Sequence, residues 1–234
     1  MMTALPYLAM MGFRRPWRAN PQYRMKSRES STRGMQCRHG GGTAPMATVP
    51  ASSYLPRNHQ AQQHSNWCGP ASMAMALGHM GVRRSQASLA KAAGIGTSGS
   101  GVGIYAMQSV LNNIGKSHGF AWNIQTLRYT PTSADKALYK KRLVQSITGR
   151  TGSGKRYPLI VNFRILKSGK RPGGYPAGRE IRHHVEVRGY KESGAWTQIQ
   201  EPATSLWGKH GLSAHYPWPS DHVVAMAGDR GYLY

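Results

Sequence analysis

Apolar positions along the chain follow either a helical or a strand-like spacing, and the helical spacing predominates in the N-terminal half. Helix-forming residues and apolar spacing predict helices over residues 68–80, 83–93, 104–114 and 133–147, with a short one over 221–227. Alternating or short apolar runs predict strands over residues 122–129, 157–166, 182–190 and 196–200, with an edge strand at 231–234. We therefore expect an α+β fold in which an N-terminal helical half packs on a mostly antiparallel β-sheet half.

The first predicted helix differs from the others because a cysteine stands at its start. Residues 62–81 read QQHSNWCGPASMAMALGHMG. Asn66 can cap this helix, Pro70 is tolerated in its first turn, and Gly81 can end it. Cys68 is then the N-terminal residue, where the helix dipole and the unpaired amides favour a negative charge. That position lowers the pKa of a thiol and predicts that Cys68 is a nucleophile.

A thiolate nucleophile needs a base, and the best candidate lies in RHHVEVRGY at residues 182–190. In a strand, His183 shares one face with two valines, whereas His184 shares the other face with Glu186 and Arg188. The face of His183 is otherwise apolar, and the polar face is expected to meet water. This pattern favours His183 as the buried base, with His184 as its main rival.

Two more side chains complete the predicted catalytic site. Glu201, at the end of the strand 196–200, can hold His183 in the required tautomer. Gln62 stands six residues before Cys68 and can donate to an oxygen that gains charge during acyl transfer; Gln63 and Gln60 are alternatives. The predicted catalytic residues are Cys68, His183, Glu201 and Gln62.

The order and spacing of these residues resembles the papain-like cysteine peptidases, with a closer likeness to the bacterial branch related to bacteriocin-processing (double-glycine) peptidases. Three motifs carry the resemblance: QxxxxxCGPA from Gln62, HxVxVxGY from His183, and Glu-Pro-Ala at 201–203, where the family usually has Asp-Pro or Asn. The resemblance covers roughly residues 55–234. It implies a papain-like fold and hydrolysis of peptide bonds by a Cys-His-Glu triad with a glutamine in the oxyanion hole.

The chain is strongly basic. Its 234 residues include 31 Lys and Arg against 8 Asp and Glu, a net charge of +23. The first 50 residues contribute eight basic residues and one acidic residue, or +7, which leaves +16 on the rest. Residues 1–50 lack sustained periodicity and are predicted to be a disordered basic extension, and residues 51–234 to be the peptidase domain. The charge indicates solubility or adhesion to anionic surfaces, whereas nucleic-acid binding is disfavoured because no groove-reading helix or RNA-binding motif is present.

No cofactor or metal site is predicted. Gly94-x-Gly96-x-x-Gly99 follows a predicted helix where a dinucleotide site needs a strand, and GRTGSGKR at 149–156 precedes a strand where a phosphate-binding loop needs a helix. A reactive Cys68 excludes a disulfide with Cys37, so the compartment stays open. Residues 5–13 make a poor secretory signal, although the resemblance favours a secreted or cell-surface protein.

Peptide or protein substrates are the predicted partners, and two other functions remain open. The same triad can transfer or deamidate amides, as in a transglutaminase or a toxin. A catalytically inactive basic binding module of the same fold would use only the positive charge.

Overall fold

The computed structural model describes residues 48–234, which belong to one compact unit. The predicted disordered extension and Cys37 therefore lie outside the described residues, and the boundary at residue 50 stays a prediction. Among the described helices, none is long and apolar enough to cross a membrane.

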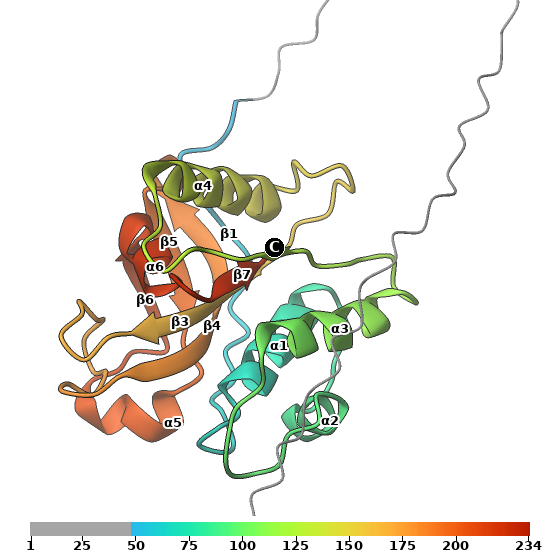
Figure 1. The fold of residues 1–234 in the computed structure, drawn as a ribbon. Helices are drawn as coiled ribbons and strands as arrows, with labels where there is room; N and C mark the ends of the chain where they lie inside the picture. Colours follow the sequence, from blue (N-terminus) through green and yellow to red (C-terminus); the bar gives the residue numbers. More distant parts are fainter. Residues whose placement is uncertain (1–47) are drawn as a thin grey trace, which may run out of the picture. The chain divides into compact units, whose positions relative to one another are not determined.

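The described residues form helices first and a sheet second, as the sequence predicts (Figure 1). The helices are α1 (Cys68–His79), α2 (Gln86–Ala92), α3 (Ile104–Gly115), α4 (Ser133–Thr148), α5 (Thr204–Trp207) and α6 (Ser220–Met226), with 3-10 turns η1 (Glu192–Gly194) and η2 (Gly208–His210). The strands are β1 (Ser53–Tyr54), β2 (Ile124–Gln125), β3 (Leu159–Ile165), β4 (Ile181–Lys191), β5 (Trp196–Gln200), β6 (His215–Pro219) and β7 (Gly231–Leu233).

All strand pairs are antiparallel, and the sheet has the order β2-β7-β3-β4-β5-β6, with β1 paired to β4. This order corrects one prediction: the C-terminal strand β7 lies between β2 and β3 and is not an edge strand. The helix α5 and the edge strand β6 have no counterpart among the predicted elements. Prolines are tolerated in β6 because one side of an edge strand needs no partner.

The sheet separates two hydrophobic cores. Leu159, Val161 and Phe163 of β3 point into a core with α4 and α6, whereas Ile160 points into a core with α1 and α3. Figure 1 shows α4 and α6 beside the upper part of the sheet and α1, α2 and α3 grouped on the other side. Because both faces are covered, the central strands are buried on both sides.

The burial of β4 corrects the expectation that its polar face meets water. His184 is 5% exposed and Glu186 is fully buried, because α1 packs on that face. The Glu186 carboxylate accepts from Gln200 Nε2 at 2.7 Å and lies 3.3 Å from His79 Nε2 at the end of α1. The polar side chains on this face are therefore hydrogen-bonded to other residues and not to water. For this reason, the alternation of polar and apolar residues in β4 does not show which face is exposed to solvent.

One predicted helix cap is wrong. Asn66 does not cap α1: Trp67 precedes the helix and provides no side-chain cap. The helix α4 is capped by Thr132 in a reciprocal pair with Asp135, and α2 is capped by Ser85, whose side chain accepts from the Ser88 N–H. The predicted strand 122–129 is reduced to the two residues of β2.

Candidate active site

Cys68 is the first residue of α1, as predicted, and the segment before it is fastened to a glycine-rich loop. Asn66 Nδ2 donates to the carbonyls of Gly96 and Ser98 at 3.1 Å, and Trp67 Nε1 donates to Gly96 at 2.7 Å. The apolar residues of α1 are buried against α3 and the sheet, which fixes the helix. These bonds attach residues 96–100 to the segment that leads into Cys68.

Two imidazoles lie beside the Cys68 thiol, which is 8% exposed. Its Sγ lies 3.7 Å from His184 Nδ1, and His183 lines the same cleft as Cys68. Burial alone would raise the pKa of Cys68, but hydrogen bonds from both histidines, and their charge, hold this pKa well below its usual value. The surroundings therefore favour the thiolate, which is the nucleophilic form.

His183 is linked on its other side to a carboxylate. Its Nε2 lies 2.6 Å from Glu201 Oε1, and both side chains are almost fully buried. Burial opposes a charge on the ring, but the Glu201 carboxylate and the Cys68 thiolate raise the pKa of His183 to about 10. The structure thus brings three predicted residues together: His183 is bonded to Glu201 and lines one cleft with Cys68.

Glu201 is held by more donors than the sequence reveals. Its Oε1 also accepts from the Ala203 N–H at 2.8 Å, and its Oε2 accepts from the hydroxyls of Tyr175 and, at 3.1 Å, Tyr216. Burial, followed by the neighbouring carboxylate, raises the pKa of both tyrosines well above 10, so they remain donors. Burial would raise the pKa of Glu201, but the charge and hydrogen bond of His183, with these donors, lower it.

Gln62 lines the same cleft as Cys68, and its side-chain amide is already hydrogen-bonded. Its Nε2 donates to the carbonyls of His64 at 2.8 Å and Ser65 at 3.0 Å, and its Oε1 is buried without a partner among the described residues. Its backbone bonds to Pro202 and Ser205, next to Glu201. Both amide hydrogens are therefore used inside the loop, and an incoming oxygen would have to displace one of these carbonyls. The side chain of the alternative, Gln63, is exposed.

A cleft of about 300 Å³ opens onto these side chains. Gln62, Cys68 and His183 line it together with Gly99, Gly101 and Trp207. The Trp207 ring lies 5.6 Å from the His183 ring and 5.2 Å from that of Tyr175. Neither Trp207 nor the two tyrosines was expected at the site, because they come from loop-like sequence far from both motifs.

The sequence also matches a known family over most of its length. The model of the Peptidase_C39 like family matches residues 53–215. The chain belongs to this family. It is accordingly a cysteine peptidase, as predicted, and its α+β, papain-like fold is the one expected, with helices first and the antiparallel sheet second.

Several solved structures are similar to this C39-like peptidase. The peptidase domain of Streptococcus ComA, a bifunctional ABC transporter, is 16% identical, with a TM-score of 0.44 over 75% of this chain and 93% of that one. A C39-like peptidase from Bacillus anthracis is 15% identical, with a TM-score of 0.48 over 79% and 98%. A double-glycine protease crystallised with a leader peptide is 15% identical, with a TM-score of 0.45 over 77% and 91%.

The family assignment rests on the sequence match over residues 53–215 and not on these structures. No curated protein sequence matches the chain.

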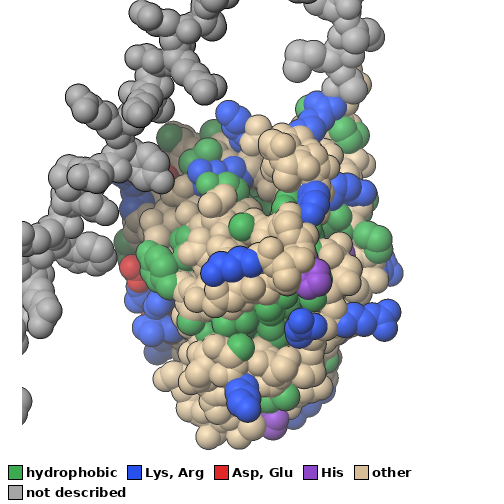
Figure 2. All heavy atoms as spheres, turned by 90° about the vertical axis from the view of Figure 1, so that its right-hand side faces the viewer, with side chains coloured by type: hydrophobic (Ala, Val, Ile, Leu, Met, Phe, Trp, Pro, Cys, Tyr) green, Lys and Arg blue, Asp and Glu red, His purple; other side chains and the backbone are tan. Residues whose placement is uncertain are grey.

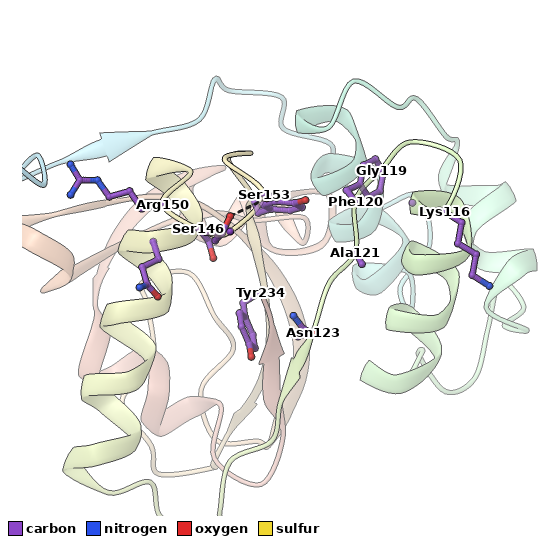
Figure 3. A pocket seen from close by; sticks show the side chains of 14 residues that line it. Lys116, Gly119, Phe120, Ala121, Asn123, Ser146, Arg150, Ser153 and Tyr234 are labelled. Atoms are coloured by element: carbon purple, nitrogen blue, oxygen red, sulfur yellow. Dashed lines mark hydrogen bonds between the residues drawn. The ribbon is translucent and has the colours of Figure 1, made fainter. Parts of the chain in front are cut away.

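A second, larger hollow in this C39-like peptidase lies away from Cys68. It measures about 840 Å³ and is bordered by α3, α4 and the segments around Asn123 and Tyr234 (Figure 3). In Figure 3 the Asn123 and Tyr234 side chains face the space between α3 and α4, while Lys116 and Arg150 extend away from it. Its lining contains no cysteine, histidine or carboxylate, so it has no nucleophile–base pair.

Proposed function

We propose that this cysteine peptidase hydrolyses peptide bonds with Cys68 as nucleophile, His183 as base and then acid, and Glu201 as the residue that orients His183. The observation that carries the proposal is the buried His183–Glu201 pair, 2.6 Å apart, whose imidazole lines one open cleft together with Cys68 and lowers the pKa of its thiol. This is the nucleophile–base–orienter order required for acyl transfer.

The reaction follows from these contacts. His183 takes the thiol proton, and the thiolate attacks the peptide carbonyl. His183 then protonates the leaving amine, so that the C–N bond breaks and a thioester forms on Cys68. Water gives a proton to the same imidazole and attacks the thioester, which releases the acid product and restores the thiolate.

The oxyanion of each tetrahedral state is assigned to the Cys68 N–H and Gln62 Nε2. The first amides of a helix have no partner within it, which makes the Cys68 N–H a suitable donor. Gln62 lines the same cleft, and one of its two N–H groups exchanges the Ser65 or His64 carbonyl for the substrate oxygen. Loss of one such donor costs about 100- to 1000-fold in kcat.

A peptide library followed by mass spectrometry tests the proposal. The unmodified protein should cleave a subset of peptides, Cys68→Ala should cleave none, and His183→Ala should lose about 100- to 10,000-fold in kcat/KM. His118→Ala, on the exposed loop after α3, is the matched histidine control.

Two results would overturn the proposal. Retained cleavage by Cys68→Ala is one. The other is formation of amine adducts without cleavage when an amine is added, which would assign the site to amide transfer.

A further inference from the structure

A second imidazole touches the nucleophile. His184 follows His183 on β4 and projects to the opposite face, toward α1, where Nδ1 lies 3.7 Å from Cys68 Sγ. Both groups are buried, with His184 5% and Cys68 8% exposed. If His183 is the base, it does not require a second imidazole at the sulfur. The contact between His184 and Cys68 therefore points to a separate role for His184.

The two histidines differ in the hydrogen-bond partner of their Nε2 atoms. His183 Nε2 meets the Glu201 carboxylate, whereas His184 Nε2 is buried without a partner among the described residues. On the face of His184, Glu186 is occupied by Gln200 and His79, and Arg182 is exposed and paired with Glu180.

The uncharged Asn162 is the neighbour of His184 on β3. No carboxylate among the described residues therefore contacts the His184 ring, and its hydrogen-bond neighbour there is Cys68 Sγ. When the sulfur is a thiolate, which can only accept, Nδ1–H is the donor in this contact.

We propose that His184 is a second catalytic imidazole, which donates its Nδ1–H to the Cys68 sulfur while His183 carries the moving proton. The inference rests on the proposed role of Cys68 as nucleophile. It matters most in deacylation, when the C–S bond breaks and the electron pair stays on sulfur. His183 then holds the proton taken from water, and the His184 N–H receives the departing thiolate.

The test measures the thiol directly and needs no substrate. In a Cys37→Ser background, alkylation of Cys68 by iodoacetamide is followed by intact mass from pH 4 to 10. His184→Phe keeps a ring but removes the donor, and His184→Asn restores an amide N–H near the position of Nδ1. His118→Phe is the control for replacing a histidine by phenylalanine elsewhere, and thermal melting checks that each variant is folded.

We expect His184→Phe to shift the alkylation midpoint upward by about one pH unit, because one donor to the thiolate is lost. His184→Asn should recover at least half of that shift, and His118→Phe should show none. With a cleaved peptide, His184→Phe should lower kcat about 10-fold with little change in KM.

Three outcomes would overturn the inference. An unchanged alkylation profile in a folded His184→Phe protein is the first, and failure of His184→Asn to recover any of the shift is the second. The third is full peptidase activity in His183→Ala with none in His184→Asn, which would make His184 the base. Normal alkylation behaviour without any peptide cleavage by the unmodified protein would instead defeat the proposed function and leave the role of His184 at sulfur intact.

Discussion

At the scale of single residues, the orientation of Glu201 depends on hydroxyl groups from two distant segments. Tyr175 comes from the β3–β4 connection and Tyr216 from the edge strand β6, and both donate to Oε2. Glutamate is one methylene longer than the aspartate usual in the family, and these donors fix the extra rotatable bond. In the proposed mechanism the tyrosines act on His183 through Glu201 and are positioning residues.

Tyr175→Phe should therefore weaken catalysis without affecting substrate binding. A hydrogen bond to a charged group contributes about 1.5–3 kcal/mol, so kcat should fall about 10-fold or more while KM stays nearly constant. Tyr129→Phe, which removes an exposed hydroxyl, is the control. Steady-state kinetics decide: a changed KM with unchanged kcat would show that Tyr175 contacts substrate and does not position Glu201.

The lowered pKa of Cys68 predicts an unusual pH dependence. An ordinary cysteine loses about 80-fold in thiolate between pH 8 and pH 6. Cys68 should lose much less than this, because its depressed pKa keeps the thiolate until the pH falls through that lower value. Peptide cleavage should also decline as pH rises through about 10, where His183 loses its proton. The rate of alkylation by iodoacetamide is measured as a function of pH for Cys68 and, as a reference, for glutathione. The same pH dependence for both thiols would contradict the lowered pKa of Cys68.

The residues nearest the chemistry were the most predictable ones. Cys68, His183 and Glu201 stand in local patterns, and the structure brings them together; their catalytic roles remain proposals. The environment of His184 is less predictable. The sequence predicts that its face of the strand is exposed to solvent, whereas the structure buries that face. Tyr175, Tyr216 and Trp207 have no local signal, since their relation to Glu201 and His183 arises only from the fold.

At the scale of elements, the packing of α1 against the glycine-rich loop and α3 determines where Cys68 sits. A Cβ on Gly69 would lie 2.1 Å from Val102 Cγ1 and 3.3 Å from Met107 Sδ. The glycine is therefore required by close packing and not by an unusual backbone angle.

Gly69→Ala should force α1 and the start of α3 apart. We expect the free energy of unfolding to fall by about 1–3 kcal/mol, as for other overpacked cores, together with kcat/KM. Gly96→Ala, where an added Cβ meets nothing within 4 Å, should leave both unchanged. Urea unfolding measures the free energy of unfolding. Equal stability of the Gly69→Ala and Gly96→Ala variants would show that Val102 moves aside freely.

The elements also show why periodicity succeeds in helices and fails in β4. An apolar stripe identified α3 within one residue, because one face of that helix meets a core and the other meets water. The strand β4 lies between α1 and the α4–α6 side, and its polar positions are satisfied by Gln200 and His79. Hydrogen-bonded partners from other elements cannot be found from the strand's own sequence.

At the scale of the molecule, the surface charge is almost entirely positive. Each carboxylate in residues 48–234 has a partner: Asp135, Glu180, Glu186, Glu192, Glu201, Asp221 and Asp229. Lysine and arginine are spread over the face in Figure 2, and acidic groups there are scarce. Arg179 and Arg182 line the cleft itself.

Acidic peptides should therefore be cleaved more efficiently than neutral ones of the same length, and the advantage should depend on salt. We expect kcat/KM for a peptide with several Asp or Glu to fall about 10-fold between 50 and 500 mM NaCl, because screening weakens electrostatic attraction. The peptide with Asn and Gln in their place should change little. Equal salt dependence for both peptides would contradict a role for the charge in substrate capture.

The position of β7 has a consequence for the nascent protein. The apolar strand β3 leaves the ribosome well before β7, its neighbour on one side, and everything from β4 to α6 is made in between. During that interval β3 presents unpaired N–H and C=O groups along one edge, which is a template for association with other chains. Slow translation of residues 166–230 would lengthen this exposure, so the yield of native enzyme should depend on synthesis speed and on chaperones that cover the open edge.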